Sequence, residues 1–465
     1  MPVEWSGLSP DVFVQLDRRS PQTLGSQLQN ALRTAVRDGR LRTGERLPSS
    51  RKLAADLGVS RGLVQATYEQ LEAEGYLRAV GGSATRVAFS PQPTVLTSPK
   101  STLSALPEID FAPGRPDLNS FPVRDWLWAC AEAARTASAR DMGYGDSQGS
   151  IKLREVIASY LQRVRGAFAS ADDVVVCGGF TQGTALTLAA LRAAGATSVA
   201  VEDPGHLDMP ALVRRSGLNP VFVPVDDRGL VVDDLARTNA TAVIVTPAHQ
   251  TPTGVVLTPE RRLALLRWAE RVSGVVIEDD YDSEFRYDKQ PVGSLQGLAT
   301  ERVASVGSVS KSLAPAIRLG WVLAPRHLKA RIAEEKHRSD RGSPTLDQLG
   351  LALLIESGRF DRHLRRMRGV YAARRGELVE ATGRHAPNLE LTGLAAGFHA
   401  VALLPEGANE AEIVDAAAHR SVGLHGLGRY RSPNSEGRPG IVFGFGNVNQ
   451  DAIRRGIAAI GDLLR

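Results

Sequence analysis

The sequence predicts a multidomain protein with a small α+β winged helix-turn-helix domain, followed by a large α/β domain with a mostly parallel sheet. Three observations predict this class. The first 90 residues contain helical apolar spacing with helix-opening residues, and short apolar runs alternate with helical patterns further on. A chain of 465 residues is also too long for one ordinary core.

The N-terminal region predicts three helices and two strands. Residues 21–40 carry an apolar stripe at four-residue steps, formed by Leu24, Leu28, Leu32 and Val36. Pro48 and Ser49 open a second helix, and Ser60 caps a third that runs to about Glu74. Residues 75–87 predict two short strands around a Gly81-Gly82 turn, which is the wing.

The later apolar runs are short and do not alternate with polar residues. They lie at 174–176, 199–201, 242–245, 275–277 and 303–306. Such runs indicate strands that are buried on both faces, and therefore a largely parallel sheet covered by helices. Ligands bind such sheets beyond the carboxyl ends of the strands. Each run is followed by polar or glycine-rich residues, so we expect these to serve one ligand.

Lys311 stands out because the chain has only seven lysines and this one lies among small and apolar residues. Serines flank it, and the next charged residue is Arg318. Such a lysine loses its proton easily and attacks a carbonyl. The upstream run 275–281 ends in acids and a tyrosine. Together these stretches offer pyridoxal 5'-phosphate (PLP) an amine for a Schiff base, a carboxylate for its pyridinium nitrogen, and hydroxyls and a guanidinium for its phosphate.

Three motifs resemble those of the MocR-type, GabR-like transcription regulators of the GntR family. They are LPSSRKLAADLGVSRGLVQATYEQLEAEGYL at 47–77, EDDYDSEFRY at 278–287 and SVSKSLAPAIRLGW at 308–321. In that family a winged helix-turn-helix precedes a PLP-dependent fold-type I, aminotransferase-like domain. The resemblance implies PLP on Lys311, double-stranded promoter DNA, a small-molecule effector and a homodimer.

The resemblance also assigns cofactor contacts. It implies that Thr181 and Gln182 hold the phosphate through their amides, and that His206 takes the place of a ring-stacking aromatic residue. Thr251 replaces the usual asparagine at the cofactor hydroxyl. The remaining expected contacts within one subunit are Tyr281, Ser308, Ser310 and Arg318. The resemblance implies that Tyr144 reaches into the site of the partner subunit.

Three of these assignments have alternatives. His206 stands where the resemblance places an aromatic residue near the cofactor ring, and its alternative is an ordinary loop histidine. Asp279 is our choice for the pyridinium nitrogen, but Glu278 and Asp280 compete for that role because spacing alone leaves the register open by one residue. For Arg318 the alternative to a phosphate clamp is a salt bridge to an acid such as Glu278.

The DNA contacts expected from the same resemblance lie at the helix starts and the wing tip. They are Ser49, Arg51, Lys52, Ser60, Arg61, Gly81 and Gly82. Arg61 begins the recognition helix, where a guanidinium can form the bidentate contact to guanine that dominates direct readout. A surface salt bridge is the alternative for Arg61 alone. Residues 1–90 carry twelve Lys and Arg against nine Asp and Glu, which is weak support for a phosphate-binding surface.

Composition excludes several classes. With 43% hydrophobic and 23% charged residues the chain is typical of a soluble globular protein. We find no apolar stretch long enough to span a membrane and no signal pattern, so we expect a cytoplasmic protein without a membrane partner. Two cysteines, Cys130 and Cys177, cannot form a disulfide framework, and no spacing predicts a metal site.

The predicted domains are a DNA-binding domain at 1–88, a linker rich in Pro, Ser and Thr at 89–107, a large PLP-binding domain at 108–370 and a small C-terminal subdomain at 371–465. The leading hypothesis is a regulator in which an effector amine or amino acid, or PLP itself, meets Lys311 and alters promoter binding. The alternative is a working aminotransferase with an accessory DNA-binding domain. Thr251, and the lack of an arginine at 440–446 for a substrate carboxylate, argue against efficient transamination.

Overall fold

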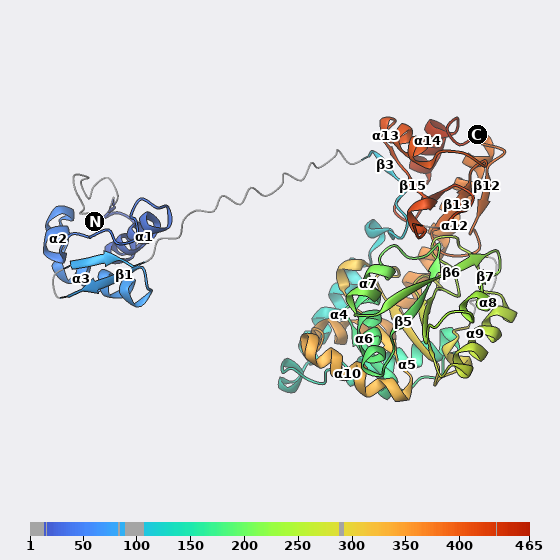
Figure 1. Ribbon diagram of the computed structural model, residues 1–465, viewed down its shortest axis with the longest axis horizontal. Helices are drawn as coiled ribbons and strands as arrows, with labels where there is room; N and C mark the ends of the chain where they lie inside the picture. The colour runs from blue at the N-terminus through green and yellow to red at the C-terminus, as the bar shows by residue number, and fades with distance from the viewer. Residues whose placement is uncertain (1–13, 15, 82–83, 89–106, 288–292, 434) are drawn as a thin grey trace. The chain divides into compact units, whose positions relative to one another are not determined.

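The computed structural model describes residues 14, 16–81, 84–88, 107–287, 293–433 and 435–465. The predicted wing residue Gly82 and residues 89–106 of the predicted linker lie outside these ranges. The chain divides into two compact units, Met1–Leu103 and Ser104–Arg465 (Figure 1). The first contains the predicted DNA-binding domain, and the second contains both parts of the predicted aminotransferase-like region.

The N-terminal unit has the predicted order of helices and strands. Its elements are α1 (Leu24–Arg37), α2 (Ser50–Leu57), α3 (Arg61–Ala73), β1 (Leu77–Val80) and β2 (Ala84–Val87). The two strands form an antiparallel hairpin. Three of the four residues in the predicted apolar stripe, Leu28, Leu32 and Val36, are fully buried against α3, whereas Leu24 is half-buried.

Side-chain caps set the starts of α2 and α3. The Ser49 hydroxyl accepts a hydrogen bond from the Lys52 amide at 3.2 Å, and the Ser60 hydroxyl accepts one from Leu63 at 3.3 Å. Gly58 ends α2 in the left-handed region with φ +62°, which an L side chain rarely adopts. This turn brings the start of α3 close behind the end of α2, as the helix-turn-helix requires.

The second unit is built on an eight-stranded mixed sheet in the order β4-β11-β10-β9-β8-β5-β6-β7. The strands are β4 (Val174–Cys177), β5 (Ser198–Asp203), β6 (Asn219–Asp226), β7 (Gly229–Leu230), β8 (Ala242–Val245), β9 (Val275–Asp280), β10 (Val303–Ser308) and β11 (Gly320–Leu323). All five predicted strands are present, and β10, β9, β8, β5 and β6 are parallel to one another.

Two strands depart from the parallel arrangement. β11 runs antiparallel between β4 and β10, and β7 is antiparallel to β6. The hydrophobic pattern did not predict β11, because this strand has only four residues and its first two belong to the motif at 308–321, which was assigned to cofactor binding. The position of β11 between β10 and β4 brings the Lys311 loop next to the start of α6.

Both faces of the sheet are covered by helices, which explains why the strand runs are continuously apolar. On β9, Val275 and Ile277 belong to the core cluster shared with α6, α7 and α10, whereas Val276 belongs to the cluster shared with α8 and α9. The helices of this part are α4 (Val123–Thr136), α5 (Ile151–Arg165), α6 (Phe180–Ala193), α7 (Met209–Arg215), α8 (Val232–Leu235), α9 (Pro259–Arg271), α10 (Arg326–Asp340) and α11 (Thr345–Glu356).

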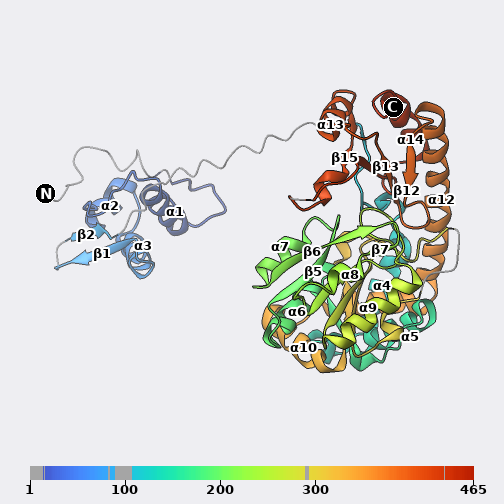
Figure 2. The ribbon, with the colours of Figure 1, turned by 45° about the vertical axis from the view of Figure 1, so that its right-hand side comes forward.

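The C-terminal elements gather at one end of the second unit, beyond the sheet (Figures 1 and 2). They comprise β12 (Glu390–Thr392), β13 (His399–Leu403), α13 (Glu410–His419), β14 (Val422–Gly423), β15 (His425–Gly426), β16 (Gly440–Gly444) and α14 (Gln450–Ile460), with β3 (Ile109–Asp110) paired to β14. The 27-residue helix α12 (Arg359–His385) packs on both α11 and α14. The predicted boundary at 370/371 therefore falls within a continuous helix. Within the described ranges no helix is both long and apolar enough to cross a membrane.

Candidate functional site

A cavity of about 340 Å³ opens beyond the carboxyl ends of β4, β5, β8, β9 and β10. This is the position expected for a ligand on a parallel sheet. Nine of the residues singled out from the sequence line it, namely Thr181, His206, Thr251, Asp279, Tyr281, Ser308, Ser310, Lys311 and Arg318. The structure thus brings together side chains that follow or end five separate strands and are spread over residues 181–318.

Lys311 lies on the cavity wall just after β10. Its Nζ donates a hydrogen bond to the carbonyl oxygen of Gly114. Burial lowers the pKa of Lys311 below its ordinary value, and the Asp279 and Asp282 carboxylates offset only part of that effect. A neutral amine is the nucleophilic form, so this environment favours attack on an aldehyde.

Asp279 is the acid of β9 that faces the cavity. The two other acids considered for the pyridinium nitrogen have other partners. Glu278 accepts a hydrogen bond from the Leu295 amide at 2.8 Å, and Asp280 accepts one from Arg165 Nε at 2.6 Å. Asp279 itself is 5% exposed and accepts no hydrogen bond from the described residues. Burial, followed by the charges of neighbouring acids, raises the pKa of Asp279 well above its usual range. A carboxylate buried without a partner is costly, and a cation on the cavity side would offset that cost.

The end of the cavity next to α6 is suited to an anion. Gly179 is the N-cap of α6, and no side chain caps this helix, so its first amides have no partner within the helix. A β-carbon at Gly179, where φ is +104°, would lie 3.6 Å from Arg318 Nη1 and 3.7 Å from Ser310 Oγ. Ser308 Oγ and Ser310 Oγ are 2.8 Å apart. These groups converge on one small volume.

Arg318 makes no ion pair with any described residue, so the structure does not contain the alternative salt bridge to Glu278. Its backbone is in the left-handed region, with φ +52°. A non-glycine residue pays a conformational cost there, and such costs are concentrated at functional sites.

Gln182 and Tyr144 do not line the cavity. Gln182 accepts the Gly178 amide at 2.6 Å and donates to Asp340 at 2.7 Å, so its side chain holds the glycine turn in place. Its backbone lies in the first turn of α6. Tyr144 is 83% exposed and lies against the Arg341 guanidinium. An exposed tyrosine is compatible with a site in a partner subunit, the role that the resemblance gave it.

Three further predicted contacts, His206, Tyr281 and Thr251, also line the cavity. The His206 ring accepts the Asp208 amide at Nδ1, and burial lowers the pKa of His206, so the ring is held neutral. The Tyr281 hydroxyl donates to the His249 carbonyl at 2.9 Å. The Thr251 amide donates to Thr246 Oγ1 at 3.1 Å.

Sequence reasoning missed several lining residues. Phe180, Asp208, His399 and Tyr430 also border the cavity. His399 comes from β13 and Tyr430 from a short 3-10 turn, and they lie 78 and 109 residues beyond the last recognised motif, which ends at Trp321. No local pattern marks them, because only the folding of the C-terminal subdomain onto the sheet brings them there. Phe180 could have been found, since it directly follows the glycine turn.

Glu202 lies beneath the cavity and predicts a pH effect on stability. Its carboxylate accepts a hydrogen bond from the Thr246 hydroxyl at 2.6 Å, and burial raises the pKa of Glu202 from 4.5 to about 7. Between these values the folded state binds more protons than the unfolded state, so unfolding free energy should fall as pH rises from about 4.5 to 7. The Glu202 contribution is on the order of 3 kcal/mol.

We expect Glu202→Gln to remove this part of the slope, as measured by chemical denaturation at several pH values. A variant whose stability falls as steeply as wild type over the same interval would contradict the assignment.

Six of the seven predicted DNA contacts belong to the described part of the N-terminal unit, and Gly82 lies outside it. Ser49 and Ser60 form the caps described above, and Arg51, Lys52 and Arg61 are exposed at the first turns of α2 and α3. Arg61 forms no salt bridge with the residues that the structure describes. Gly81 is exposed in the wing with φ +48°.

Comparisons with known proteins match both units. The model of the bacterial regulatory proteins of the gntR family matches residues 24–87, and that of the class I and II aminotransferases matches residues 107–422. The chain is 33% identical to the HTH-type pyridoxine biosynthesis transcriptional regulator PdxR of Corynebacterium glutamicum, covering 97% of this chain and 98% of that protein. It is 32% identical to the probable rhizopine catabolism regulatory protein MocR of Rhizobium meliloti, covering 96% and 94%.

The chain belongs to the MocR-type branch of the GntR family. Among solved structures, an archaeal alanine:glyoxylate aminotransferase matches with a TM-score of 0.70 and 25% identity, over 77% of this chain and 90% of that one. This MocR-type protein therefore combines a GntR winged helix-turn-helix with a fold-type I aminotransferase-like domain.

The MocR-type cavity contains two strongly basic side chains among its described lining residues, Lys311 and Arg318. Three arginines precede the segment 440–446, where the resemblance places the arginine for a substrate carboxylate, and each has other hydrogen-bond partners. Arg429 donates to His425, Arg431 to the carbonyls of Gly437 and Arg438, and Arg438 to Glu390. One protomer thus offers no second guanidinium to a bound carboxylate in the described part of the cavity.

Proposed function

We propose that this protein is a cytoplasmic, PLP-dependent transcription regulator. In this proposal a homodimer binds promoter DNA through the N-terminal unit, and Lys311 holds PLP in the cavity as a Schiff base. An effector amine or amino acid, or PLP itself, then alters promoter binding. The observation that carries the proposal is that Lys311, Asp279 and Arg318 converge on one cavity of a chain whose other unit is a GntR domain. Among the described residues, the Asp279 carboxylate accepts no hydrogen bond and Arg318 makes no ion pair.

In this proposal, different side chains of the cavity would bind different groups of the cofactor. Asp279 would carry the negative charge opposite the pyridinium nitrogen, and the cofactor would supply the electron sink that this pairing maintains. The start of α6 would hold the phosphate with Ser308, Ser310 and Arg318. His206 would lie against the ring, and Tyr281 and Thr251 would lie at its hydroxyl edge. Tyr144 of the partner subunit would complete the site.

The alternative is an aminotransferase with an accessory DNA-binding unit. Thr251 occupies the asparagine position, and its hydroxyl is shorter than an asparagine amide. The described lining residues also include no second guanidinium, which weakens the capture of an amino acid carboxylate by one protomer. Both observations favour a sensor over an efficient transaminase.

The test is promoter-DNA affinity of the full chain, measured for protein stripped of PLP, loaded with PLP, and loaded and then mixed with an amino acid. We expect a change of at least severalfold at one of these steps. A change on loading alone would make PLP the signal, whereas a change only with the amine would make the amine the effector. Identical affinities throughout, or steady transamination without any DNA binding, would contradict the proposal.

Arg318→Gln should weaken PLP binding by at least tenfold. The variant loses charge-assisted hydrogen bonds to phosphate, which contribute about 1.5 to 3 kcal/mol each. Fluorescence or absorbance titration of the stripped protein with PLP measures this. The matched control is Arg326→Gln, because Arg326 is exposed at the start of α10. Equal affinities for the two variants would remove Arg318 from the phosphate site.

A further inference from the structure

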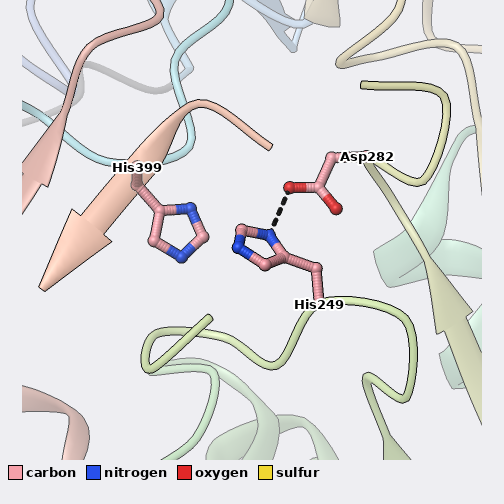
Figure 3. A group of neighbouring side chains, drawn as sticks. All are labelled: His249, Asp282 and His399. Atoms are coloured by element: carbon pink, nitrogen blue, oxygen red, sulfur yellow. Dashed lines mark hydrogen bonds and ion pairs between the residues drawn. The ribbon is translucent and has the colours of Figure 1, made fainter. Parts of the chain in front are cut away.

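Three buried side chains meet at the cavity edge and have no part in the cofactor contacts proposed above. His249 lies in the loop after β8, Asp282 follows β9, and His399 begins β13 (Figure 3). Their exposed fractions are 1%, 1% and 3%. His249 and Asp282 belong to the sheet loops, whereas His399 belongs to the C-terminal subdomain, so the cluster joins two parts of the second unit.

The hydrogen bonds of His249 define its charge. Its Nδ1 is 2.8 Å from Asp282 Oδ2, and its Nε2 is 3.3 Å from the Gly393 carbonyl. Both partners are acceptors, so the ring satisfies them fully only when both nitrogens carry protons. Burial opposes this charge, but the Asp282 carboxylate and its hydrogen bond outweigh burial and raise the pKa of His249. When its ring is protonated, the form that these contacts favour, His249 makes a buried ion pair with Asp282.

His399 is the neutral member of the cluster. Its Nε2 donates to the Pro252 carbonyl at 3.1 Å, and its ring centroid is 4.6 Å from that of His249. Burial, together with the charge on His249, lowers the pKa of His399 well below its ordinary value. The three side chains offer ligand atoms within 4.8 Å of one another, which is also a metal-site spacing. In the doubly protonated ring that these two acceptors favour, neither His249 nitrogen has a lone pair for a metal.

The cluster contacts the proposed cofactor site directly. The Tyr281 hydroxyl, which lines the cavity, is 3.1 Å from His249 Nδ1 and donates to the His249 carbonyl. The backbone at Gly397 packs tightly against His249 and Asp282. A β-carbon at Gly397, where φ is +69°, would lie 2.2 Å from Asp282 Oδ2 and 2.5 Å from His249 Cε1.

We propose that His249 is a positioning residue that fixes the Tyr281 hydroxyl, balances the Asp282 charge near Lys311, and connects the cofactor site to the C-terminal subdomain through Gly393. This inference rests on the function proposed above. The charge of the histidine would change the pKa of the Lys311-linked nitrogen. The contact between His249 and Asp282 would also couple a movement of the C-terminal subdomain to the cofactor site.

The charges around the cluster determine in which direction the pKa of the Lys311-linked nitrogen should change when His249 is replaced. Asp282 and Asp279 both raise the pKa of Lys311, while Arg286 acts on His249 with the opposite sign to Asp282. His249→Gln keeps hydrogen-bonding groups but removes the positive charge, which leaves Asp282 uncompensated. The pKa of the Lys311-linked nitrogen should then rise by on the order of one pH unit. Adding Asp282→Asn removes the surplus negative charge and should return the pKa toward the wild-type value.

The experiment is a pH titration of the absorbance spectrum of PLP-loaded full-length protein. It compares wild type, His249→Gln, the His249→Gln/Asp282→Asn double variant and the exposed control His327→Gln. We expect an upward shift in the single variant, a return in the double variant and no shift in the control. Promoter-DNA affinity, measured in parallel, should lose part of its response to loading in His249→Gln only.

Each other outcome overturns the inference. An unshifted midpoint in His249→Gln, or a double variant that does not return, shows that the histidine has only a structural role. One equivalent of metal in wild type that is lost in His249→Gln would make the cluster a metal centre instead. If wild type takes up no PLP, the proposed function and this inference fail together, whereas a loaded wild type with unshifted variants sinks the inference alone.

Discussion

Lys311→Ala is expected to abolish the visible absorbance of bound PLP and the response of promoter binding to PLP or amine, while basal DNA binding persists. The reason is covalent: Lys311 is the sole lysine among the described residues that line the cavity, and burial lowers its pKa, which increases the share of the neutral, nucleophilic amine. The N-terminal unit has its own core, so loss of the amine should leave its DNA contacts intact.

Lys329→Ala is the matched control for this prediction. Lys329 is a half-buried lysine of α10 that lies 3.7 Å from Asp173 and outside the cavity. It should retain both colour and response. A Lys311→Ala protein that keeps its absorbance band, or still changes promoter affinity on loading, would remove Lys311 from the mechanism.

Arg61→Ala is expected to weaken promoter binding by about tenfold to a hundredfold and to relax its sequence preference. Arg61 is exposed at the first position of α3 behind the Ser60 cap, with no salt bridge among the described residues. A bidentate arginine contact to guanine contributes about 1 to 3 kcal/mol. Fluorescence anisotropy with the DNA upstream of its own gene, and with base-substituted versions of it, measures both effects.

The control here is Arg135→Ala. Arg135 is an exposed arginine of α4 in the other unit, paired with Glu132. Its loss should leave affinity and sequence preference unchanged, which separates a local DNA contact from a general loss of positive charge. Equal DNA affinities for Arg61→Ala and wild type would exclude α3 as the recognition helix.

The sequence predicted those features that depend on local pattern. Four-residue apolar spacing placed α1, and serine caps placed the starts of α2 and α3. The runs at 242–245 and 275–277 became central strands because a strand buried on both faces has to be apolar throughout. Nine of the cavity residues could be named because each follows a strand or lies in a motif.

Other features depend on tertiary contacts and could not be found this way. The register at 278–280 needed the Arg165 side chain, which pairs with Asp280 from α5, and the Leu295 and Gln296 amides that bind Glu278. His399 and Tyr430 reach the cavity only when the C-terminal subdomain packs on the sheet. His249 stands two residues before Thr251, but no local pattern connects it to Asp282, which is 33 residues away in the sequence.

The most direct test of the central claim is covalent trapping in the unmodified protein. Wild-type protein is incubated with PLP, reduced with borohydride, digested, and its peptides are weighed by mass spectrometry. We predict one reduced adduct, carried by the peptide that contains Lys311. Protein that stays unlabelled at Lys311, or is labelled only at exposed lysines such as Lys52, would contradict the account.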